Sequence, residues 1–181
     1  MIKSLSIGLL LLPFVLPAAV RSQAIPTATR SRSLQVGGGF SFASPDYGGS
    51  YIMGITGYTD LDLPHRFGAE LDLHFMNIFT PTDIGESTFL IGPRYSILSQ
   101  HRLNAYIKAL GGFGRFAYQQ GTYPNPHTDT YGVFSIGGGV EFRASDHINV
   151  RAIDFEAQRW PGYADHGLSP FVTTFGVAYV R

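Results

Sequence analysis

The sequence of 181 residues contains no cysteine, so disulfide bonds and thiolate metal ligands are excluded. Charged residues make up only 14% of the chain, against about 25% in average globular domains. Their formal charges cancel to zero, so neither a nucleic-acid-binding surface nor a disordered acidic tail is indicated. After residue 24, no apolar run reaches the roughly 18 residues that suggest a transmembrane helix.

The chain is rich in glycine, with 22 residues, and in aromatic residues, at 14%. Beyond the first 24 residues no helical periodicity stands out, and apolar residues alternate with polar ones instead. Residues 66–75, "RFGAELDLHF", place apolar side chains at 67, 69, 71, 73 and 75 and polar residues or glycine between them. A period of two predicts a strand with one apolar and one polar face.

The N-terminus, residues 1–24, has the pattern of a cleaved secretory signal peptide. Lys3 supplies the positive charge, residues 7–16 form the apolar segment, and small residues stand before the cleavage site. We expect cleavage after Ala24, with Ala19 as the alternative, and therefore an exported protein. Residues 25–32 are predicted to be a flexible leader, and 33–181 a single all-β domain.

Eight strand-like segments follow the leader, separated by turn residues. They lie at about 33–43, 51–61, 66–77, 87–96, 104–117, 131–143, 148–159 and 170–180. Three connections are short, at 62–65, 97–102 and 144–147, and four are long, at 44–50, 79–86, 119–130 and 161–167. Short and long connections alternate, so an up-and-down meander places them at opposite ends. That pattern is typical of outer-membrane barrels, and it predicts an eight-stranded antiparallel transmembrane β-barrel.

Packing volume indicates which face of each strand points inward. The interior of an eight-stranded barrel has little room for bulky chains on every strand, whereas glycine, serine and a few long charged chains fit. The apolar face is therefore predicted to face lipid, because so large an apolar belt in water would aggregate. The predicted lipid-facing belt comprises Leu71, Leu73, Phe89, Ile91, Ile107, Ile136, Val140, Phe175 and Val177.

The opposite face predicts an ionic network in the lumen, with nearly balanced charges. Its candidates are Glu70, Asp72, Arg94, Lys108, Glu141, Arg143, Arg151, Asp154 and Glu156. The alternation breaks between Arg151 and Asp154, which predicts a bulge that turns both side chains inward. Such a network is tolerated only if its charges are paired. It can serve as a gate in an occluded pore or as structural packing alone.

Aromatic residues near the strand ends predict two girdles at the membrane boundaries. Tyr51, Phe75, Phe79, Phe89, Phe116, Tyr118, Tyr131 and Trp160 lie toward the long loops, and Phe67, Tyr95, Phe142 and Tyr179 toward the short turns. The three short turns each carry a histidine, His65, His101 and His147, on separate hairpins. We interpret them as solvated turn residues, and we expect neither a metal site nor a cofactor.

Several segments resemble the small outer-membrane β-barrel domain family, the eight-stranded OmpA/OmpX-like group. They include "GITGYTDLDLPHRFGAELDLHF", "FLIGPRYSI", "AYIKALGGFGR", "FSIGGGVEFRASDHINVRAIDFEAQRWPG" and "FGVAYVR", and the resemblance covers 33–181. It implies a location in the outer membrane of a Gram-negative envelope, insertion by the barrel-assembly machinery and a non-enzymatic role. The chain departs from the family at its last residue, Arg181, where such chains often end in an aromatic residue.

Two other classes of protein remain as alternatives. Some barrels of this size modify lipid A, and Asp165, His166 and Ser169 lie together in the last long loop. No nucleophile elbow accompanies them, and the glycine-rich stretches lie inside strands rather than in phosphate-binding loops. A secreted, soluble, ligand-binding barrel is the second alternative, but it needs an apolar lumen, which the assignment of the faces excludes.

The sequence therefore predicts a monomeric outer-membrane barrel with a structural or surface-interaction role, such as membrane integrity or adhesion. Its expected partners are outer-membrane lipid, the barrel-assembly machinery and an unidentified surface ligand, with no nucleic acid. The longest loop is the predicted contact element, through Tyr123, Pro124, Asn125, Pro126 and His127.

Overall fold

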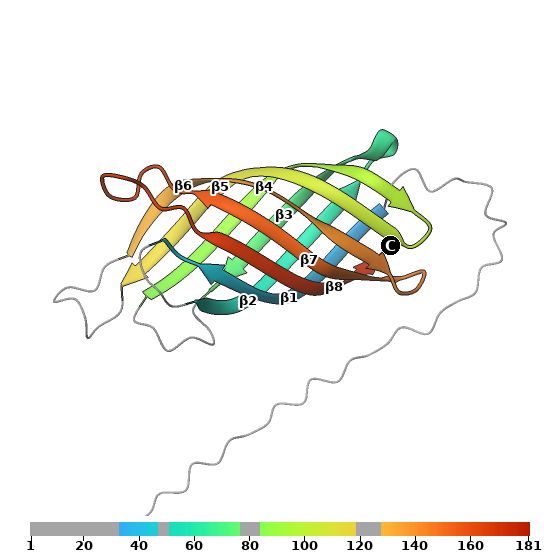
Figure 1. Cartoon of the computed structure of the whole chain (residues 1–181), viewed down its shortest axis with the longest axis horizontal. Helices are drawn as coiled ribbons and strands as arrows, with labels where there is room; N and C mark the ends of the chain where they lie inside the picture. The colour runs from blue at the N-terminus through green and yellow to red at the C-terminus, as the bar shows by residue number, and fades with distance from the viewer. Residues whose placement is uncertain (1–32, 47–50, 77–83, 119–127) are drawn as a thin grey trace, which may run out of the picture.

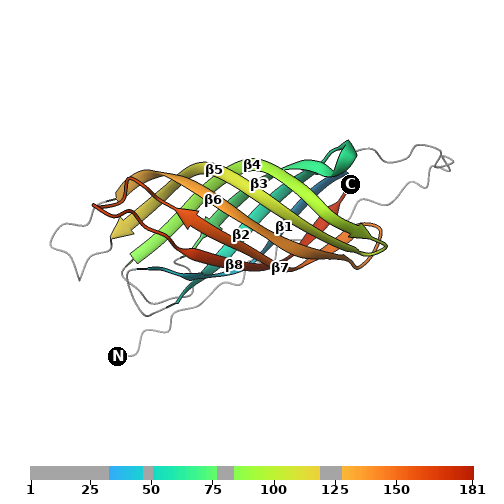
Figure 2. The same ribbon diagram turned by 45° about the horizontal axis from the view of Figure 1, so that its top comes forward.

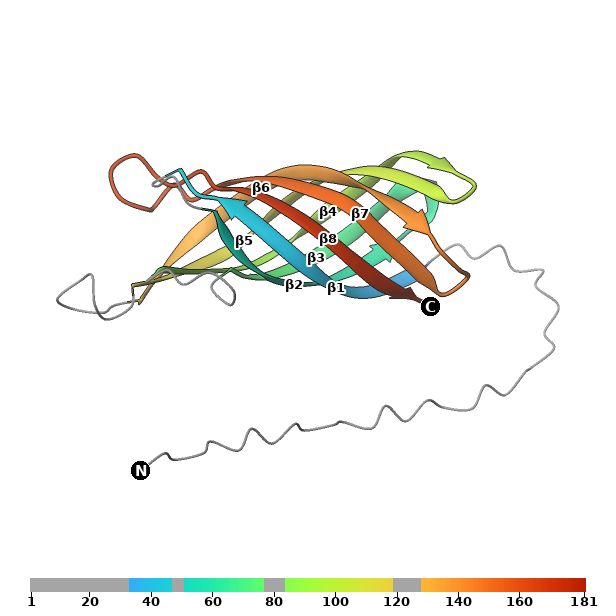
Figure 3. The ribbon, with the colours of Figure 1, turned by 60° about the horizontal axis from the view of Figure 1, so that its bottom comes forward.

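The computed structural model describes residues 33–46, 51–76, 84–118 and 128–181, and within these ranges eight antiparallel strands form a closed barrel (Figure 1). The strands are β1 (Ser33–Ser44), β2 (Ile52–Asp62), β3 (Phe67–Phe75), β4 (Ile84–Gln100), β5 (Leu103–Tyr118), β6 (Thr128–Arg143), β7 (Ile148–Arg159) and β8 (Phe171–Val180). A short 3₁₀ turn, η1 (Pro64–Arg66), joins β2 to β3. Each strand pairs with the next, and β8 pairs with β1 to close the ring (Figure 3). Among the described residues, no helix is long and apolar enough to cross a membrane.

The predicted fold class and strand order are confirmed, and most strand ends lie within three residues of the prediction. The largest difference is β4, which was predicted to end at residue 96 and extends to Gln100. A register irregularity between Ser96 and Leu98 lets β4 continue past the polar residues that resembled a turn. The connection from β4 to β5 is therefore reduced to His101 and Arg102, and His101 takes a positive φ of 46°.

Short and long connections lie at opposite ends of the barrel, as predicted. The three short connections share one end with the C-terminus, and the strand ends that lead into the long connections lie at the other end (Figures 1 and 2). We refer to these as the short-turn end and the long-loop end. Arg181 at the C-terminus joins the wall, because its backbone exchanges two hydrogen bonds with Leu34 of β1, at 2.9 and 3.2 Å.

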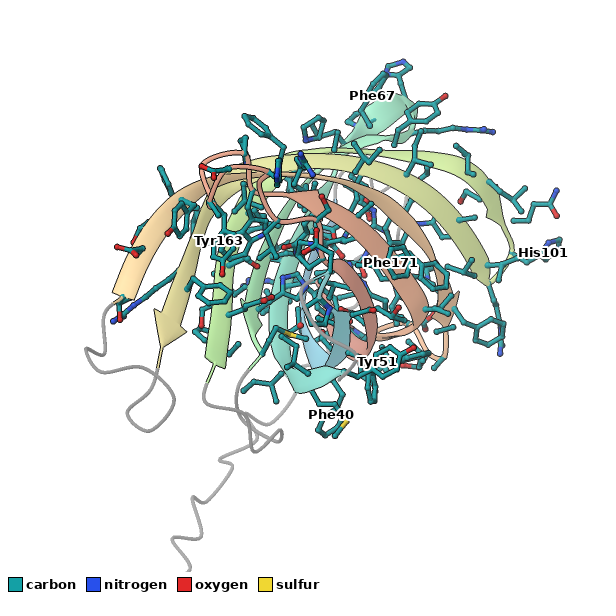
Figure 4. The ribbon with its side chains drawn as sticks, turned by 60° about the vertical axis from the view of Figure 1, so that its left-hand side comes forward. Phe40, Tyr51, Phe67, His101, Tyr163 and Phe171 are labelled. Atoms are coloured by element: carbon teal, nitrogen blue, oxygen red, sulfur yellow. The ribbon has the colours of Figure 1, made fainter. Side chains whose placement is uncertain are left out.

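The predicted inversion of the faces is confirmed. Along β3, Glu70, Asp72 and His74 are buried, whereas Phe67 and Phe75 at the strand ends are 58% and 44% exposed. Figure 4 shows Phe40 and Phe67 projecting outward from the wall. The predicted belt residues all lie on this outer face: Phe89, Ile91, Ile107, Ile136, Phe175 and Val177 are exposed, and Leu71, Leu73 and Val140 are half-buried.

The predicted bulge in β7 is also confirmed. The pairing of β7 with β8 shifts register between Arg151 and Asp154, and the pairing with β6 shifts beside it, between Val140 and Glu141. The extra residue at the bulge shifts the alternation of inward-facing and outward-facing side chains along β7 by one position. As a result both Arg151 and Asp154 are buried inside the barrel.

Several predictions lie outside the described residues. They are the signal peptide at 1–24, the leader at 25–32, Phe79, and the loop residues Tyr123, Pro124, Asn125, Pro126 and His127.

Candidate functional site

The middle of the barrel interior contains charged side chains from the inner faces of six strands. We call them the ionic cluster: Asp60, Glu70, Asp72, Arg94, Lys108, Glu141, Arg151, Asp154 and Glu156, all at most 2% exposed except Lys108 at 4%. Lys108 of β5 lies between two pairs of carboxylates. Its Nζ is 2.7–2.9 Å from Glu70 and Asp72 of β3, and 2.8 Å from Asp154 and Glu156 of β7. The amine of Lys108 thus connects β3 and β7, which lie on either side of β5 in the ring.

Two arginines extend these contacts across the lumen. Arg151 of β7 lies 2.9 Å from both Asp60 and Glu70, on the opposite wall, and 3.3 Å from Glu141. Arg94 of β4 lies 2.8 Å from Asp60 and 2.5 Å from Glu141. Except for the pair of Arg151 with Glu141 on the neighbouring strand β6, these pairs join strands that are not neighbours in the ring. They therefore cross-link the barrel through its interior and occupy the lumen at this level.

Aromatic rings cover the two guanidinium groups. The guanidinium carbon of Arg94 lies 3.7 Å from the ring centroid of Tyr106, and that of Arg151 lies 3.7 Å from the centroid of Tyr58. A cation over an aromatic face gains electrostatic stabilisation when water is excluded. Glycine makes room for one ring, because a Cβ at Gly37 would overlap Tyr58. The hydroxyl of Tyr106 donates a hydrogen bond to Asp154.

Acids outnumber bases in this cluster. Of the residues that the structure describes, six carboxyl groups and three cationic side chains belong to it, so full ionisation would leave three excess negative charges. His74 borders the cluster, with Nε2 3.7 Å from Glu156 and Nδ1 3.0 Å from the hydroxyl of Thr88. The prediction of nearly balanced charge was therefore wrong. Among the described residues, no group of acids and histidines has the arrangement of a metal site.

Eight of the nine predicted lumen residues lie together in the interior, and the ninth, Arg143, lies elsewhere. Arg143 was expected inside, but its side chain is exposed at the short-turn end, because it is the last residue of β6 and lies at the mouth of the barrel instead of in its middle. Asp60 belongs to the ionic cluster, although the sequence analysis did not include it among the lumen residues. The alternation of β2 could have revealed it, since Thr56, Tyr58 and Asp60 follow one another on the inner face.

A second layer of the interior is apolar and lies toward the long-loop end. We call it the apolar plug: Leu90, Leu110, Phe116, Val133, Trp160 and Leu168. Trp160 is fully buried, and a Cβ at Gly114 would overlap its ring. Its Nε1 donates to Gln158, 3.2 Å away, and Gln158 donates to Glu156, at 3.3 Å, which links the plug to the ionic cluster.

The plug corrects two predictions. Phe116 and Trp160 were assigned to the outer aromatic girdle, but both side chains are buried inside the barrel. The interior was also expected to hold small and charged side chains, with the bulky apolar ones outside, yet inner-face glycines free enough volume for several bulky chains near the loops. The short-turn girdle agrees better with its prediction, since Phe67, Phe142 and Tyr179 are exposed on the outside.

The short-turn end opens into a polar cavity of about 330 Å³. Ser33 and Gln35 donate hydrogen bonds of 3.0 Å to Asp62 at this mouth, and Asn149 donates to Gln35 at 2.9 Å. Glu141 forms part of its lining and also belongs to the ionic cluster, which closes the cavity toward the middle of the barrel.

The last long loop has a different organisation from the one an acyl-transfer site needs. The side-chain oxygen of Ser169 accepts a hydrogen bond from Arg159, which also donates to the carbonyl of His166 at 2.9 Å. The backbone nitrogen of Ser169 donates to Asp46, at 2.8 Å. A guanidinium cannot act as the base that activates a serine, so the geometry gives no support to a Ser169 nucleophile.

Comparison with known proteins gives the fold a context. No family model matches the sequence, and no curated protein matches it. Neisserial surface protein A (NspA) superposes with a TM-score of 0.66 at 12% identity, covering 82% of this chain and 96% of that one. Ail, the attachment invasion locus protein of Yersinia pestis, gives 0.59 at 11% identity, covering 83% and 99%. The N-terminal β-barrel domain of Pseudomonas aeruginosa OprF gives 0.56 at 11%, covering 82% and 97%.

The fold is that of the eight-stranded outer-membrane barrels. At this level of identity the likeness concerns the fold alone, and fold does not determine function. The roles of the side chains in this outer-membrane barrel fold therefore follow from the contacts of this chain itself.

Proposed function

We propose that the chain spans the outer membrane as a closed barrel that contributes to membrane structure and presents its long-loop end to partners at the cell surface. The observation that supports it best is the inversion of the faces: phenylalanine, isoleucine and valine project outward, while carboxylates and guanidinium groups are buried. Such a surface is stable only in a bilayer or an equivalent apolar solvent, because in water it is a large contiguous apolar patch.

A surface-interaction role has support from the long-loop end. The 160–170 connection is held by Arg159, by the buried Trp160 and by the bond from Ser169 to Asp46. It exposes Asp165 and His166 on this ordered support. The related folds include a surface protein and an attachment protein, the latter also solved with a heparin analogue, so immobilised heparin is a first probe for binding.

We also propose that the lumen does not conduct. The ionic cluster crosses the interior, and the apolar plug fills it nearer the long loops. In planar bilayers the purified protein should give no steady ion current. Steady openings of the wild-type protein would show that these two layers do not close the lumen.

Location and orientation can be tested together, because the chain has no cysteine and any introduced thiol is the only one. Asp165→Cys places a thiol at the long-loop end, and Asp146→Cys is the matched variant in a short turn. Cells expressing each variant are treated with a membrane-impermeant maleimide. Heat-dependent migration of the outer-membrane fraction on gels reports whether the barrel is folded.

The proposal expects labelling of the Asp165→Cys variant on intact cells, and of the Asp146→Cys variant only after permeabilisation. The reverse pattern would overturn the orientation. Absence of folded protein from the outer-membrane fraction would overturn the location.

A further inference from the structure

A groove lies at the rim of the wall at the short-turn end, between the β4–β5 turn and the end of β6. It is lined by Gln100, His101, Arg102, Leu103, Phe142 and Arg143, and its volume is about 660 Å³. Figure 4 shows His101 at the tip of the β4–β5 hairpin, away from the barrel axis. The two arginines are adjacent in space, since the backbone nitrogen of Arg143 donates to the carbonyl of Arg102 at 2.7 Å.

Arg102 and Arg143 also line the polar cavity at the short-turn mouth, but no carboxylate of the described residues neutralises either of them there by an ion pair. Within the described ranges, neither Arg102 nor Arg143 forms an ion pair with a carboxylate, and both side chains are exposed. The arginines of the interior are the opposite case, because Arg94 and Arg151 each contact several acids. Two exposed guanidinium groups from neighbouring backbone positions, neither of them in an ion pair, provide several N–H donors for an anion, and their planar fork suits a phosphate.

The apolar part of the groove continues the outer belt. Leu103 and Phe142 are directly paired across β5 and β6, and they are 39% and 44% exposed. Along the outer faces of the same strands, the apolar surface continues through the half-buried Val140 to Ile107 and Ile136, both exposed. The groove thus has cationic donors at the rim and an apolar wall that leads into the lipid-facing surface.

We propose that this groove binds the phosphate headgroup of an anionic phospholipid, with Arg102 and Arg143 as its ligands and with an acyl chain against Leu103 and Phe142. Charge complementarity supports the headgroup assignment, and continuity with the lipid-facing belt supports a lipid rather than a free anion. Basic side chains at a membrane interface each add about a five-fold preference for an anionic surface. The proposal rests on membrane insertion of the barrel.

The test uses purified protein refolded into phosphatidylcholine vesicles with and without phosphatidylglycerol, and native mass spectrometry of bound lipid. The Arg102→Gln/Arg143→Gln variant is compared with Arg66→Gln/Arg181→Gln, which removes the same charge from the same end outside the groove. All four positions are exposed, so folding is expected to survive. Heat-dependent gel migration verifies insertion in each case.

The wild-type protein and the Arg66/Arg181 variant should retain phosphatidylglycerol in preference to phosphatidylcholine, and the groove variant should lose most of that preference, roughly 10-fold or more. Inorganic phosphate at millimolar concentration should not displace the lipid. Equal loss in both variants, or no preference in the wild-type protein, would overturn the proposal, and so would displacement by phosphate alone. Failure to insert into any vesicle would instead contradict the membrane barrel itself.

Discussion

The ionic cluster and the apolar plug fill the same lumen by opposite physical means. The cluster consists of charged side chains that are stable in the interior only because each cation contacts several acids, with Lys108 touching four carboxylates. The plug needs no pairing, since Trp160, Phe116 and their neighbours exclude water by volume. Removing one member should therefore have different consequences: an unpaired charge in the first layer and an empty space in the second.

The largest effect is expected for Lys108→Met. This change leaves Asp72, Asp154 and Glu156 without their shared cation in a cluster that already has more acids than bases. Breaking a buried pair from one side costs about 3–5 kcal/mol. Urea unfolding of the barrel in lipid vesicles should show the loss as a lower midpoint. An unchanged midpoint would mean that the cluster is not a stabilising unit.

A comparable but distinct loss is expected for Trp160→Ala in the plug. The substitution removes a fully buried ring, and such changes cost about 3–5 kcal/mol where the cavity cannot collapse. The same unfolding experiment measures it, and the double variant with Lys108→Met should show nearly additive losses if the two layers act separately. Strong coupling would show that the bridge through Gln158 joins them into one unit.

A smaller effect is expected for Gly114→Ala. The added methyl group would overlap the ring of Trp160, and overpacking of this kind costs about 1–3 kcal/mol. Replacing Trp160 with leucine in the same chain should relieve most of that cost. If Gly114→Ala is equally harmful beside leucine, the glycine serves the backbone and not the ring.

The smallest effect is expected for Arg143→Met, the residue that sequence analysis placed in the cluster. Its side chain is exposed, so the free energy of unfolding should change by less than about 0.5 kcal/mol. A loss as large as that of Lys108→Met would restore the original assignment and contradict the position in the structure.

Sequence alone could predict the strands, their order, the bulge at Arg151 and the direction of each face, because alternation depends only on neighbouring residues. It could not assign depth along the barrel axis. Strand tilt and stagger bring distant positions such as Arg151 and Glu70 to one level, and they place Arg143 at the short-turn mouth. The plug was missed for a related reason: the space for Trp160 comes from Gly114 on another strand, and no local pattern reports that match.

The central claim is that the barrel has its apolar face in lipid and its charged face inside, and the neighbours Ile107 and Lys108 test it most directly. Ile107 is 51% exposed on the outer face, whereas Lys108 is buried in the cluster. The decisive measurement is unfolding of the Ile107→Arg variant in vesicles of increasing bilayer thickness, beside the wild-type protein in detergent-free buffer. We predict a loss of about 2–4 kcal/mol that grows with thickness, and no folding of the wild-type protein without lipid or detergent. Cooperative folding of the wild-type protein in plain buffer, with an Ile107→Arg effect independent of the bilayer, would contradict the account.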